Sequence, residues 1–222
     1  MSRDAIEKDA SLNPPSHLQE VRKMKRAVIT ALVMGLLSLG VFASSPSGLA
    51  VGEKIEAFLV KNCEGGDPYC QVCKYGRRPK LISVGDLSDP AWIEDLKALQ
   101  ALHEKYSNDG KGLAVFALAA SIHDGKAAPV ADPDAALARL KVIKEQNKLT
   151  FPLVIAQNAD EIYKAQGKTN QGYKIFENYY KVTESRTLMF GDKSNTVKYN
   201  AVLSGDTRQQ FSELEAVLQK SL

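Results

Sequence analysis

The sequence predicts an α/β domain in which helices cover both faces of a central mixed β-sheet. Apolar runs typical of strands alternate with segments whose apolar residues recur at helical spacing. Asp89-Pro90 and Asp132-Pro133 each indicate a helix start, because aspartate caps a helix and proline suits its first turn. Two late apolar runs flank the loop 191–195, a pattern typical of a β-hairpin, and a hairpin makes the sheet mixed.

The expected elements follow one another in a regular order. The apolar runs predict strands over 55–60, 80–84, 113–120, 151–156, 187–190 and 196–203. Helices are expected to begin near Asp89, Asp132, Asp160 and Thr207. The run 113–120 is apolar throughout, as is typical of a strand that is covered on both faces.

Composition and charge exclude several classes of protein. The chain has 222 residues, of which 44% are hydrophobic and 25% are charged, so it is not intrinsically disordered as a whole. Residues 1–43 carry six Lys/Arg and four Asp/Glu. Residues 44–222 therefore carry 23 Lys/Arg and 22 Asp/Glu, which is a net charge of +1. Such a balanced charge predicts no nucleic-acid partner.

The N-terminal segment has the layout of a secretory signal. Residues 22–26 are mostly basic, residues 27–43 carry no charge, and the small residues Val41 and Ala43 precede Ser44. We therefore expect cleavage near Ala43/Ser44 and export to the periplasm or the cell exterior. The alternative is an uncleaved anchor, although a membrane span needs about 20 apolar residues.

These signals divide the chain into three expected parts. Residues 1–43 form an N-terminal extension and signal peptide, whose true start is better placed at Met24. Residues 44–50 form a short tether, and residues 51–222 form the folded domain. The membrane is expected as a partner only through an uncleaved N-terminal segment.

All three cysteines fall within eleven residues, at Cys63, Cys70 and Cys73. A C-x-x-C pair can exchange disulfides with partners, form an inert structural disulfide, or bind a soft metal ion such as copper or zinc. Export favours a redox or structural disulfide, because exported cysteines meet an oxidising environment. The basic neighbours would favour a thiolate, and two acidic neighbours would oppose it; they are Lys74, Arg77 and Arg78, and Glu64 and Asp67.

The third cysteine leaves several alternatives open. Cys63 could attack a mixed disulfide, pair with Cys70 or Cys73, or act as a third metal ligand. A zinc site would need a fourth ligand, and beyond residue 43 the only histidines are His103 and His123. We expect no cofactor, with copper or zinc as the less favoured alternative.

Three segments carry a resemblance to a known superfamily. The run Val51–Phe58 resembles an N-terminal hairpin motif, and Phe151–Ile155 and Asp160–Gly167 resemble a core strand and the helix that follows it. Together they resemble the thioredoxin superfamily, in particular its peroxiredoxin and periplasmic thiol-disulfide oxidoreductase branch. The resemblance implies a thioredoxin-like fold with an N-terminal β-hairpin extension.

The chain departs from that superfamily at two positions. Where the resemblance places the reactive cysteine, residues 85–90 contain none, and where it places a proline before a late strand, residues 185–187 contain none. The Cys70/Cys73 pair instead precedes the first core strand.

The favoured interpretation is thiol-disulfide exchange through Cys70 and Cys73, with thiols or disulfides of exported proteins as partners. In that interpretation Cys70 is the more exposed nucleophile and Cys73 the resolving thiol. The alternative is a non-catalytic binding or structural protein on the same scaffold, because a fold does not determine a function.

Overall fold

The computed structural model describes residues 47–107, 112–157, 176 and 180–222. All of them belong to the second of two units of the chain, Ser45–Leu222. The expected signal segment and the helix expected from Asp160 lie outside the described residues. Within the described ranges, no helix is both long and apolar enough to cross a membrane.

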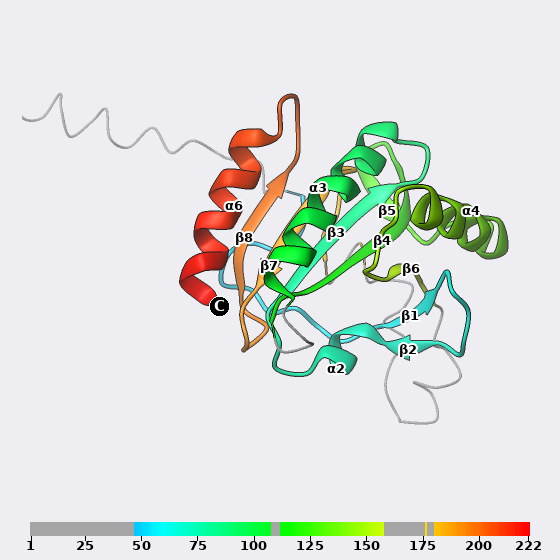
Figure 1. Cartoon of the computed structure of the whole chain (residues 1–222). Helices are drawn as coiled ribbons and strands as arrows, with labels where there is room; N and C mark the ends of the chain where they lie inside the picture. Colours follow the sequence, from blue (N-terminus) through cyan, green and yellow to red (C-terminus); the bar gives the residue numbers. More distant parts are fainter. Residues whose placement is uncertain (1–46, 108–111, 158–175, 177–179) are drawn as a thin grey trace, which may run out of the picture. The chain divides into compact units, whose positions relative to one another are not determined.

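A mixed sheet forms the centre of the described unit (Figure 1). Its order is β2-β1-β6-β4-β3-β7-β8, and β5 pairs with β4. β3 and β4 are parallel, as are β4 and β6, whereas β7, β8, β1, β2 and β5 join by antiparallel pairing. The strands are β1 (Leu59–Asn62), β2 (Tyr69–Cys70), β3 (Lys80–Asp86), β4 (Ala114–His123), β5 (Lys126–Ala128), β6 (Leu153–Ala156), β7 (Thr187–Gly191) and β8 (Val197–Val202).

Three long helices share one hydrophobic cluster with the sheet. They are α3 (Pro90–Tyr106), α4 (Pro133–Gln146) and α6 (Arg208–Ser221), and they contribute Trp92, Leu140 and Leu214 to that cluster. α3 and α6 lie side by side (Figure 1), where the Tyr106 hydroxyl donates a 2.6 Å hydrogen bond to the Glu215 carboxylate. The prediction of a mixed sheet flanked by helices is confirmed.

A second hydrophobic cluster contains other apolar side chains of the sheet. It includes Phe116 of β4, and it is completed by Val72 of the short helix α2 (Gln71–Tyr75) and by Phe58 and Tyr180 from segments between elements. The rings of Phe58 and Tyr180 meet edge to face, with 5.3 Å between their centroids.

Both predicted Asp-Pro helix starts are confirmed. The Asp89 carboxylate accepts the N–H of Ala91 at 3.0 Å, and the Asp132 carboxylate accepts the N–H of Ala135 at 3.0 Å. Each bond satisfies one of the backbone donors that the first turn of a helix leaves without a helical partner.

The first strand lies later in the chain than the sequence predicted. Residues 55–58 are not part of β1, although Ile55 and Phe58 are buried. The N–H of Ile55 donates to the carbonyl of Asn195 at 2.8 Å, so this segment joins the β7–β8 turn instead. An apolar run shows that a segment is buried, but it does not specify which backbone groups it pairs with.

Candidate active site

The Cys70/Cys73 pair lies where the hairpin of β1 and β2 passes into α2. Leu59 of β1 stands opposite Cys70 of β2, and α2 begins at the next residue. The N-terminal β-hairpin that the sequence predicted is therefore present. Cys70 and Cys73 are joined by a disulfide, and their Cα atoms are 5.2 Å apart. Of the pairings that the sequence left open, the structure contains this one.

The two cysteines have different surroundings. Cys70 is the N-cap of α2, and its Sγ atom accepts the backbone N–H of Cys73 at 3.0 Å. Cys73 is exposed, whereas Cys70 is half-buried. The expectation that Cys70 is the more exposed of the two is wrong, because the end of β2 packs against the second hydrophobic cluster.

Two of the three basic residues after the pair, Lys74 and Arg78, have partners of their own. The Lys74 Nζ atom lies 4.8 Å from the centroid of the Tyr69 ring. Arg78 donates 3.0 Å hydrogen bonds to the backbone carbonyl oxygens of residues 112 and 113, and Arg77 is exposed. Arg78 therefore links the end of α2 to the start of β4, which differs from the thiolate-supporting role that the sequence suggested.

Cys63 is a free cysteine that is buried away from the pair. It is 7% exposed and belongs to the cluster that contains α3 and α4, whereas Cys70 packs against the other cluster. Its backbone N–H donates to the carbonyl of Leu153 at 3.0 Å. Burial raises the pKa of the Cys63 thiol, so its thiolate is disfavoured.

The three-cysteine metal site has no support in this geometry. The Cys70/Cys73 disulfide leaves no thiol for a metal, and Cys63 lies in a different cluster. In the ranges that the structure describes, no group of three His, Cys, Asp or Glu residues could hold a metal ion. His103 packs against Phe151, and His123 is exposed at the end of β4.

Lys80 is a residue near the pair that sequence reasoning missed. Its side chain is fully buried, and its ammonium group donates to the carbonyls of Gly76 and Arg78 and to Oδ1 of Asn195. Burial and the Arg78 guanidinium lower the pKa of Lys80 to about 8. A lysine that opens the apolar run 80–84 was the available signal, although such a lysine is more often solvent-exposed.

Residues 85–90, where the resemblance in the sequence would place a reactive cysteine, contribute to a polar network. Asp86 accepts the Ser88 N–H at 2.7 Å, the Ser88 hydroxyl at 2.6 Å and the Ile122 N–H at 2.7 Å. The Asp86 N–H donates to the Ser185 hydroxyl oxygen, which in turn donates to Asp89 at 2.7 Å. Burial raises the pKa of Asp86, but these hydrogen bonds and His123 outweigh burial and lower it.

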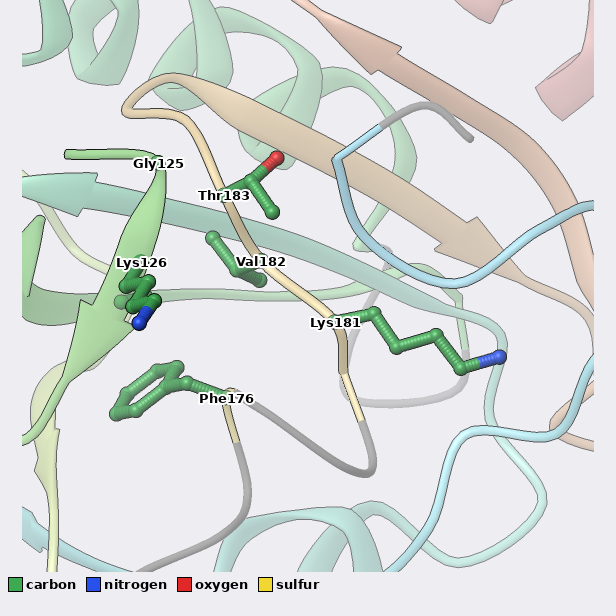
Figure 2. A pocket seen from close by; sticks show the side chains of 7 residues that line it. Gly125, Lys126, Phe176, Lys181, Val182 and Thr183 are labelled. Carbon is green, nitrogen blue, oxygen red and sulfur yellow. The ribbon is translucent and has the colours of Figure 1, made fainter. Parts of the chain in front are cut away.

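A pocket of about 350 Å³ lies apart from the cysteines, between β5 and the segment that precedes β7. Phe176 and Val182 form part of its wall, and Lys126 lies across from them (Figure 2). The Lys181 side chain points away from Phe176 and forms an ion pair with Glu53. Because no cysteine lines this pocket, it does not form part of the candidate site.

Comparisons with known proteins support the fold through structure alone. No family model and no curated protein sequence matches the chain. A solved structure of a proposed protein disulfide isomerase from Bacteroides thetaiotaomicron matches with a TM-score of 0.57 and 11% identity, over 80% of this chain and 94% of that chain.

Two further solved structures match at a TM-score of 0.51. The thioredoxin domain of a thiol-disulfide oxidoreductase from Bacteroides vulgatus is 13% identical, over 77% of this chain and 99% of that chain. A hypothetical protein from Sinorhizobium meliloti is 16% identical, over 80% of this chain and 90% of that chain. With this topology and these similarities, the chain has the thioredoxin-like fold, and its cysteine pair precedes the first core strand.

Proposed function

We propose that this protein carries out thiol-disulfide exchange through Cys70 and Cys73. The observation that carries the proposal is a disulfide with one exposed cysteine, in a short C-x-x-C helix on a thioredoxin-like fold. A disulfide exchanges only when a thiolate can reach one of its sulfur atoms, and exposure of Cys73 supplies that access.

The exchange conserves atoms and electrons in two steps. A thiolate of a partner dithiol attacks one sulfur of the Cys70–Cys73 disulfide, which forms a mixed disulfide and releases the other cysteine as a thiolate. The second thiolate of the partner then attacks the mixed disulfide. The partner leaves with a disulfide, and the pair has gained two electrons and two protons. The reverse sequence reduces a partner disulfide.

We further propose that the partners are thiols or disulfides of exported proteins, in the periplasm or outside the cell. The signal-like layout of residues 22–43 supports this assignment. A second support is that disulfides persist in oxidising compartments and are rare in the cytosol.

The competing function is a binding or structural role in which the disulfide only ties the hairpin to α2. The observation that favours it is the polar network at Asp86, Ser88 and Ser185, which replaces the usual reactive cysteine. Loss of the chemistry at the usual position is compatible with a scaffold that now serves binding.

The experiment that separates these functions is the reduction potential of the pair, measured by equilibration with glutathione, together with reduction of insulin disulfides. Exchange predicts a reduction potential above about −300 mV, because structural disulfides typically lie below that value. It also predicts that Cys70→Ser and Cys73→Ser each abolish insulin reduction, whereas the matched control Cys63→Ser retains it. A potential below that range, or full activity of either pair variant, would favour the structural role.

A further inference from the structure

The helix that carries the cysteine pair is too short to be stable by itself. α2 spans five residues, and isolated helices shorter than about 12 residues are marginal in water. The geometry of the pair therefore depends on what holds the two ends of α2. At its start, Cys70 belongs to β2, which pairs with β1 through Leu59.

Lys80 holds the other end of α2. The Nζ atom lies 2.6 Å from the carbonyl oxygen of Gly76, which is the C-cap of α2, and 2.9 Å from that of Arg78. The third bond, at 2.7 Å, reaches Oδ1 of Asn195 in the β7–β8 turn. One ammonium group therefore joins the end of α2 to a turn that lies 115 residues away from Lys80 in the sequence.

The cost of burying this group points to a specific role. Lys80 is fully buried, and the three acceptors that it reaches are neutral amide oxygens. Burying a charge without an opposite charge costs desolvation free energy, and an apolar side chain of the same length would not incur that cost. An apolar side chain could not hold the carbonyl oxygens that end α2.

We propose that Lys80 is a positioning residue for the Cys70–Cys73 pair. Its buried side chain holds the turn after α2 and thereby keeps Cys73 close to Cys70. This inference rests on the proposed function only in one respect: the proposed function says what the positioned cysteine pair is used for. The Gly76 N–H donates to the carbonyl of Cys73 at 3.0 Å, so the turn that Lys80 holds is bonded directly to one member of the pair. In the reduced protein, the same contacts keep Cys73 close to Cys70 and so favour closure of the disulfide.

The test is the equilibrium of full-length protein with reduced and oxidised dithiothreitol at neutral pH. Alkylation after denaturation counts the two thiols of the pair in addition to the Cys63 thiol, which is free in both states. Two electrons and two protons pass from the dithiol to the protein disulfide, and dithiothreitol closes to its cyclic disulfide. Lys80→Met removes the donors and keeps the length of the side chain. We expect its ratio of dithiol to disulfide to rise about tenfold over wild type, as the loss of hydrogen bonds from a charged group implies.

Lys54 supplies a matched control. Its Nζ atom donates to the carbonyl of Ser194 at 2.9 Å and to the Thr196 hydroxyl oxygen at 2.7 Å, in the same β7–β8 turn, and neither acceptor belongs to α2. Lys54→Met is expected to leave the ratio within about twofold of wild type, because exposed lysine contacts contribute little. A Lys80→Met ratio within twofold of wild type, or an equal shift in Lys54→Met, would overturn the proposal.

A second variant covers the case in which Lys80→Met does not fold. Asn195→Ala removes one acceptor and leaves the two carbonyl contacts of Lys80, and we expect a smaller shift of about threefold. An unchanged ratio in folded Asn195→Ala would then count against the proposal. The assay uses no protein substrate, so insulin reduction tests the proposed function separately from the role of Lys80.

Discussion

The backbone N–H of Cys73 donates a 3.0 Å hydrogen bond to the Sγ atom of Cys70, the sulfur to which Cys73 is itself bonded. Cys70 is therefore the sulfur that faces a backbone donor, whereas Cys73 is the more exposed residue. A hydrogen bond from an N–H stabilises a thiolate, and exposure controls access to it. These two factors favour different cysteines as the reactive thiol.

The first prediction concerns the pKa values of the two thiols. Cys73→Ser leaves Cys70 with the N–H donor, so we expect its thiol pKa to be about one unit below that of Cys73 in Cys70→Ser. The rate of alkylation by iodoacetamide as a function of pH measures both values. Both variants carry Cys63→Ser as well, so that the buried thiol adds no signal. Equal values, or the opposite order, would show that the hydrogen bond is lost on reduction.

The second prediction concerns the pH dependence of stability. The pKa of Lys80 is about 8 in the folded protein, below its ordinary value of 10.5. Between these values the folded state has lost a proton that the unfolded state retains, so the free energy of unfolding rises with pH in this window. We expect wild type to gain up to about 3 kcal/mol relative to Lys80→Met between about pH 7 and about pH 10.

Urea unfolding of both proteins across this range measures the difference. The tyrosines and Cys63 titrate in both proteins, so their contribution cancels when the free energy of unfolding of Lys80→Met is subtracted from that of wild type. Lys54→Met serves as the control, because it removes an exposed lysine that contacts the same β7–β8 turn. A difference between wild type and Lys80→Met that is constant, or that falls as pH rises, would contradict the assigned direction.

The third prediction concerns the close approach of Gly85 and Trp92. A Cβ atom at Gly85 would overlap the indole ring of Trp92, which is fully buried. The ring has no freedom to move aside, because its N–H donates to the Ser83 hydroxyl oxygen at 2.9 Å. We expect Gly85→Ala to lower the free energy of unfolding by about 3 kcal/mol, as overpacking of a core does.

Gly125→Ala is the comparison for this loss. Gly125 has a φ of 70° and no neighbouring atom within 4 Å of an added Cβ, so only backbone strain opposes the substitution. We expect a cost of about 1 kcal/mol there. Both values come from denaturant unfolding, and equal losses in the two variants would show that the ring adjusts.

Local patterns in the sequence predicted the core of the fold well. The two Asp-Pro pairs marked the starts of α3 and α4, and the apolar runs marked β3, β4 and β6. These signals are reliable because caps and apolar periodicity act within a few residues of the chain. β2 and β5 were missed, since strands of two and three residues are too short to show a period.

The candidate site was predicted only in part. Spacing identified the Cys70/Cys73 pair, but it could not decide between that pairing and one that includes Cys63. It also predicted the wrong exposure, because the environment of Cys70 depends on a hydrophobic cluster assembled from distant segments.

The sequence by itself therefore determined the class of fold, the main helices and strands, and the identity of the C-x-x-C motif. Only the tertiary structure decided that Cys63 is buried in one cluster while Cys70 packs against the other, and that Lys80 reaches both Gly76 and Asn195. The physical reason is the distance along the chain over which each kind of interaction acts. Capping and periodicity are properties of neighbouring residues, whereas contacts between distant segments follow from how the sheet and its covering elements pack.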